Sequence, residues 1–84
     1  MGTVARSGGW QVIVYANNHE PPHVHVRRAE GEMRVAIGVP RESPPTQYGQ
    51  PRGHLRESHI REAVELVAAR QVDCYEEWTR LHVP

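Results

Sequence analysis

The 84-residue sequence contains no lysine and no phenylalanine, and Cys74 is its only cysteine. A single cysteine excludes an intrachain disulfide, and the absence of a CxxC pair excludes a zinc-ribbon site. No apolar run approaches the roughly 20 residues that a membrane-spanning helix needs. Residues 1–7 also lack the apolar stretch of a secretory signal peptide. We therefore expect a soluble, cytoplasmic protein without a membrane partner.

Charge of one sign is not in excess, because ten arginines balance ten acidic residues when the six histidines are neutral. This balance argues against strongly electrostatic binding to nucleic acid or membranes, so nucleic acid is only a weakly supported partner. Below about pH 6.5 the histidines would make the protein cationic. The exclusive use of arginine suits recognition of phosphate or carboxylate groups. A GC-rich genome, which favours arginine codons, would produce the same composition.

The length permits one small domain, which we place at residues 10–84, after a flexible lead over residues 1–9. A chain of this size buries roughly 60–65% of its unfolded surface and is marginally stable alone. Only 38% of its residues are hydrophobic. A protein partner or self-association, most simply as a homodimer, would supply further buried area.

The hydrophobic pattern predicts three strands followed by two helices. The strands are expected at 10–16, 23–29 and 33–39, the last with the clearest period-2 alternation. The helices are expected at 58–71, with Ser58 as N-cap, and at 73–82, where Asp73 and Glu76 resemble a capping box. Residues 40–53 hold four prolines and are expected to form a long irregular loop, with a weak strand signal near Gln47-Tyr48. The fold class is therefore α+β, with a three-stranded antiparallel sheet packed against two C-terminal helices.

The most informative motif is a group of histidines at the start of the second predicted strand. His23 and His25 stand two residues apart, so a strand would project both imidazoles from one face. His19 lies just upstream, on a loop stiffened by two prolines. With His19 as third ligand, His23 and His25 would hold a divalent metal, most suitably zinc. Other candidates for completing such a site are Glu20, His54 and His59.

Without a metal, His23 and His25 would act as acid and base on a phosphodiester. Arg27 shares their strand face and is a candidate for binding the substrate, as is Tyr48 in the proline-rich loop. In the structural alternative the imidazoles cap loop carbonyls, Arg27 pairs with an acidic neighbour (Glu30 or Glu32), and Tyr48 is an anchor. We expect Cys74 and the other aromatic residues to belong to the core: Trp10, Tyr15, Tyr75 and Trp78.

The segment Tyr15-Ala16-Asn17-Asn18-His19-Glu20-Pro21-Pro22-His23-Val24-His25-Val26 resembles the signature of a bacterial family known as domain of unknown function 4160. That signature is a strand ending in Tyr, followed by Asp/Asn-His-x-Pro-Pro-His-Phe/Val-His-Val. The helical segment 63–67 and Glu76-Glu77-Trp78 are similar too, so that the resemblance covers about residues 10–80. Residues 42–49 depart from the family, which usually has a second short hairpin there.

The resemblance implies no assigned activity. Genes of the family often lie beside another small uncharacterised domain, in arrangements like those of toxin–antitoxin or mobile-element pairs. We therefore expect a protein-interaction module of such a pair, with a histidine-rich site that binds a divalent metal or none. The alternative is a metal- or histidine-dependent hydrolase or nuclease acting on a phosphodiester or another ester. The sequence leaves open whether the protein is an enzyme.

Overall fold

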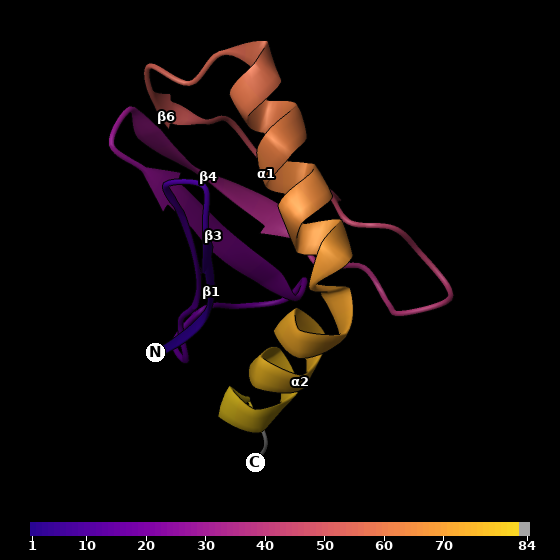
Figure 1. Ribbon diagram of the computed structural model, residues 1–84. Coiled ribbons are helices and arrows are strands. Elements are labelled where there is room, and N and C mark those ends of the chain that lie inside the picture. The colour runs from indigo at the N-terminus through magenta and orange to yellow at the C-terminus, as the bar shows by residue number, and fades with distance from the viewer. Residues whose placement is uncertain (83–84) are drawn as a thin grey trace.

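An antiparallel sheet with two helices on one face makes up the fold (Figure 1). The structure, a computed structural model, describes residues 1–82, so the last two residues of the predicted 10–84 domain lie outside the described part. The fold class α+β is confirmed, but the predicted number of strands, three, was too small, because residues 1–82 form six. The elements are β1 (Gly2–Ser7), β2 (Trp10–Val14), β3 (His23–Arg28), β4 (Gly31–Ala36), β5 (Thr46–Gln47), β6 (Arg52–Gly53), α1 (Glu57–Ala69) and α2 (Gln71–Leu81).

The first additional strand, β1, occupies the segment that was predicted to be a flexible lead. It pairs antiparallel with β2, and Ser7 lies opposite Trp10. The two residues between them, Gly8 and Gly9, both have positive φ angles, 55° and 84°. A two-residue hairpin turn of type I′ needs positive φ at both of its positions, and Gly-Gly meets that need without strain. A Gly-Gly dipeptide between two β-forming runs is a hairpin signal, and the expectation of a flexible lead did not take it into account.

The proline-rich segment supplies the other two additional strands. Residues 46–47, where the weak strand signal lay, form β5 and pair with the end of β4; residues 52–53 form β6 and pair with its start. The third predicted strand ends at Ala36 rather than at Val39. Gly38, with a φ of 72°, lies in the turn that leads out of the strand. The loop between β5 and β6 therefore runs back along one edge of β4.

The core lies between the sheet and the helices. Alternate residues of β2, β3 and β4 point into it, and α1 adds the fully buried Ala63 and Val67 from its predicted stripe. Cys74 and Trp78 of α2 are also in the core, as expected for both. The helices begin earlier than predicted: α1 starts at Glu57, and α2 follows it almost directly, with no side-chain cap at its start. Neither helix in residues 1–82 has the length and apolarity that crossing a membrane requires.

Candidate functional site

The two histidines of β3 project from the same face of the strand, and at one end of that face the ring of His23 meets Trp78 of α2, with centroids 5.6 Å apart. Val24 and Val26, on the opposite face of the strand, are fully buried in the core. The ring centroids of His23 and His25 are 5.6 Å apart. This same-side arrangement follows from the two-residue repeat of a strand.

His23 is nearly buried, with 5% of its surface exposed. Its Nδ1 lies 2.8 Å from the carbonyl oxygen of Pro21, so in the neutral ring Nδ1–H donates and Nε2 carries the lone pair. Burial lowers the pKa of His23, and the nearby charges of His25, Arg34 and His82 add to this, against the opposing effect of the Pro21 hydrogen bond. His23 is therefore a fixed imidazole that favours its neutral form.

His25 is held from two sides. Its Nδ1 lies 3.4 Å from Oε2 of Glu32, a residue of β4. Its Nε2 is buried and has no hydrogen-bond partner among residues 1–82. The ring meets Tyr15 edge-on, with centroids 4.7 Å apart, a geometry that lets an N–H or C–H edge contact a π face. The contact with the Glu32 carboxylate thus orients the ring of His25.

A small pocket of about 100 Å³ opens beside this pair, lined by His25, Glu32, Arg34, Gln50 and Arg52. Within residues 1–82, neither Arg34 nor Arg52 has a carboxylate within 4 Å, the limit for an ion pair. Two guanidinium groups therefore share the pocket with one carboxylate. The pocket is a local positive site on a chain whose formal net charge is zero.

Arg34 is positioned by the loop between β5 and β6. Its guanidinium carbon lies 4.8 Å from the ring centroid of Tyr48, within the range of a cation–π contact. On the other side it lies so close to Gly49 that a Cβ there would meet Nη2 at 2.5 Å. The Tyr48 ring also contacts His23, with centroids 5.0 Å apart. Tyr48, a predicted substrate-binding residue, therefore joins His23 to the arginine of the pocket.

Arg27 lies outside this pocket. It is exposed, and its Nε donates to the side-chain oxygen of Gln11 at 3.1 Å rather than to Glu30 or Glu32. Glu30 pairs instead with Arg28 on the core face, with 2.8 Å between Arg28 Nε and Glu30 Oε1. The guanidinium carbon of Arg28 lies 5.0 Å from the ring centroid of Trp10. Arg27 lies opposite Glu32 in the β3–β4 register, but its side chain bonds to Gln11 and does not line the pocket.

The predicted metal ligands are not gathered into a three-ligand group. Across residues 1–82, no three His, Cys, Asp or Glu side chains are placed so that they could hold one metal ion. His19 is exposed on its loop, and His54 is exposed just after β6. His59 packs edge-on against Trp10. Among the candidate ligands, His23 and His25 have neighbouring rings, with centroids 5.6 Å apart, and Glu20 is exposed beside His19.

Four residues of the pocket were missed by the sequence analysis: Glu32, Arg34, Gln50 and Arg52. Two of them had a signal, because Glu32 and Arg34 alternate with the buried positions of β4 and the hairpin register sets Arg34 opposite His25. Gln50 and Arg52 had none, since their position depends on the proline-rich segment folding back onto β4. Such pairing is set by tertiary contacts and not by local pattern.

A family model described as "Domain of unknown function (DUF4160)" matches residues 9–79. Searches of curated proteins and of solved structures return no match.

Proposed function

We propose that this chain binds and cleaves RNA phosphodiesters without a metal ion. The chain belongs to the DUF4160 family, whose function is unknown. One observation carries this proposal: His25, Glu32, Arg34 and Arg52 converge on a single pocket, and His23 lies next to it. A general base, a proton donor and two phosphate-binding cations are the groups that metal-independent phosphodiester cleavage needs.

The pocket suits a phosphate group in size and in charge. A water molecule takes about 30 Å³ of liquid volume, so the space corresponds to about three waters, which a tetrahedral oxyanion would replace. Arg34 and Arg52 supply forked donors that match phosphate oxygens. Because Arg34 is already fixed between Tyr48 and Gly49, little side-chain entropy is lost when phosphate binds.

RNA is the favoured substrate because it carries its own nucleophile. In the proposed reaction Nε2 of neutral His23 takes the proton of the 2′-hydroxyl, and the 2′ oxygen attacks phosphorus. The bond from phosphorus to the 5′ oxygen breaks, and that oxygen takes a proton from the His25–Glu32 pair. The products are a 2′,3′-cyclic phosphate and a 5′-hydroxyl. The arginines stabilise the extra negative charge on the phosphorane-like transition state.

The test is cleavage of an end-labelled single-stranded RNA by untagged protein in excess chelator. We expect fragments ending in 2′,3′-cyclic phosphate, and no cleavage of DNA of the same sequence. His25→Gln and Arg34→Gln should lower the rate by about 100-fold or more, within the range for loss of a general acid or an electrostatic stabiliser.

Matched controls come from the same residue types elsewhere. His54→Gln and Arg61→Gln change an exposed histidine and an exposed helix arginine outside the pocket, and they should cleave like the unchanged protein. Chelator-sensitive cleavage that zinc restores would instead support the metal-dependent hydrolase with His19, His23 and His25 as ligands. Absence of both RNA cleavage and RNA binding would refute the proposal.

A second candidate function, the protein-interaction module of a toxin–antitoxin-like pair, is favoured by a different observation. In the described sheet order, β1 is an outer strand that pairs only with β2. An outer strand offers unpaired backbone groups to another chain. Copurification with the product of the neighbouring gene would test this function.

A further inference from the structure

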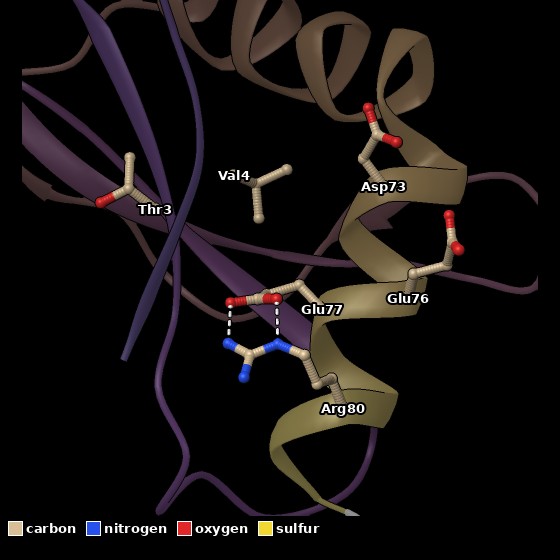
Figure 2. Close-up of a pocket in the computed structure, with 6 residues that line it drawn as sticks. All are labelled: Thr3, Val4, Asp73, Glu76, Glu77 and Arg80. Atoms are coloured by element: carbon tan, nitrogen blue, oxygen red, sulfur yellow. Dashed lines mark hydrogen bonds and ion pairs between the residues drawn. The ribbon is translucent and has the colours of Figure 1, made fainter.

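The outer strand β1 borders a groove on the helix side of the sheet. Figure 2 shows Val4 of β1 pointing toward α2, on which Glu77 and Arg80 lie opposite it. Thr3, Asp73 and Glu76 also line the groove. The groove has a volume of about 310 Å³. Val4 is half-buried and packs against the core, so the groove has an apolar wall on the strand side.

The wall on the helix side is acidic. Glu77 is neutralised by Arg80, whose Nε and Nη2 donate to its two oxygens at 2.8 and 2.7 Å, and this bonding lowers the pKa of the Glu77 carboxyl. Asp73 has only a marginal contact, 4.0 Å from Arg70. Glu76 has no cation within 4 Å in residues 1–82. The groove therefore carries net negative charge beside β1, whose outer edge pairs with no other strand in residues 1–82.

We propose that the β1 edge and this groove dock a basic, extended segment of a partner protein, which adds to the sheet as a strand beside β1. The inference rests on the second candidate function and names the surface and the chemistry of the partner. Backbone hydrogen bonds to β1 supply affinity, and basic side chains reaching Asp73 and Glu76 supply selectivity. Val4 gives the added strand an apolar contact.

A second copy of this chain fits the surface less well. Antiparallel pairing of β1 with its own copy would put both α2 helices on the same side of a joined sheet. The two acidic walls would then face each other across the junction, and like charges oppose that arrangement. The register shift between Thr3 and Ala5 also bends the strand locally, as bulges on edge strands do to prevent indiscriminate pairing.

The test uses two labelled synthetic peptides of about six residues, the usual strand length. In the basic peptide arginine alternates with valine, and in the acidic peptide glutamate alternates with valine. We expect the basic peptide to bind, and the double variant Asp73→Asn/Glu76→Gln to weaken it about threefold to tenfold at low salt, with a smaller difference at high salt. The control Glu57→Gln/Glu65→Gln removes the same charge from α1 and should leave binding unchanged.

Hydrogen exchange shows whether the peptide adds as a strand. Amides of β1 should exchange more slowly in the peptide complex, while those of β3 should not change. Equal binding of both peptides, equal binding by the Asp73/Glu76 variant, or unchanged exchange in β1 would overturn the proposal. Protection of β1 through dimerisation without peptide would assign the surface to a second copy. RNA cleavage by the Asp73/Glu76 variant should be intact, so the failure of this proposal is distinguishable from failure of the nuclease proposal.

Discussion

Replacing Gly49 with alanine tests whether the position of Arg34, and not only its charge, makes the phosphate pocket. Gly49 has a φ of 78°, and a Cβ there would lie 2.5 Å from Nη2 of Arg34. Nothing can stay at that distance, so the guanidinium must leave its place beside Tyr48. The substitution changes no charged group and no residue that lines the pocket.

The expected magnitudes separate backbone strain from displacement of Arg34. An alanine in the left-handed region costs roughly 1–2 kcal/mol, and in a chain of this size each 1 kcal/mol lowers Tm by roughly 4–8 °C. A hydrogen bond to a charged group contributes about 1.5–3 kcal/mol. Since about 1.4 kcal/mol is a factor of ten in affinity, displacing Arg34 should weaken RNA binding about tenfold or more.

Gly8→Ala is the matched control. Gly8 also has a positive φ, 55°, but no atom lies within 4 Å of a Cβ built there. Both variants should lose similar stability in thermal unfolding, and only Gly49→Ala should lose affinity for a noncleavable RNA measured by fluorescence anisotropy. Equal loss of affinity in the two variants would assign the effect to stability. Full affinity in Gly49→Ala, with a loss in Arg34→Gln, would refute the positioning argument.

Four further predictions concern stability and composition. The pKa of His23 lies below 6.5 in the folded protein, so His23 is protonated more readily in the unfolded chain. The free energy of unfolding should therefore fall as the pH drops from about 6.5 through that lower pKa. The variant His23→Gln should show a weaker dependence of the chemical denaturation midpoint on pH. Burial and Asp73 raise the pKa of the Cys74 thiol to about 12, so thiol reagents should react slowly at pH 8 until the protein is unfolded. Val67→Ala should cost about 2 kcal/mol in chemical denaturation, whereas Val72→Ala, at 56% exposed, should cost almost nothing. Elemental analysis of untagged protein should find far less than one zinc per chain; stoichiometric zinc would favour the set His19, His23 and His25.

Local pattern was enough to predict the central part of the fold. The alternation of Met33, Val35 and Ile37 predicted a strand that includes most of β4, and all three residues are buried, although Ile37 lies just after the strand ends. The spacing of His23 and His25 placed both rings on one face. These successes share a cause: each depends on the two-residue repeat within one strand, which a single sequence displays directly.

The rest of the site depends on pairings between distant segments. The proline-rich segment around Tyr48 contains no strong alternation, and its short strands exist because β4 offers them an edge. Arg52 reaches the pocket only through that pairing, which sets it opposite Glu32. The composition did not indicate this positive pocket, because a net charge of zero says nothing about where charges gather. The fold brings two arginines together beside a single carboxylate.

The C-terminal helix also belongs to the architecture of the site. His82 stacks on Trp78 with ring centroids 3.6 Å apart, and its ring nitrogens lie 2.8 Å from the Trp78 carbonyl oxygen and 3.0 Å from that of Asn18. Asn18 lies in the loop whose prolines precede β3, and Trp78 itself lies against His23, with ring centroids 5.6 Å apart. The end of α2 thus holds both the loop and the ring of His23. A chain with so small a core keeps this histidine buried and fixed because elements from both ends of the sequence close around it. The pocket beside it is built from the sheet face and the β5–β6 loop, so the fixed ring of His23 and the two arginines of the pocket are positioned by different parts of the chain.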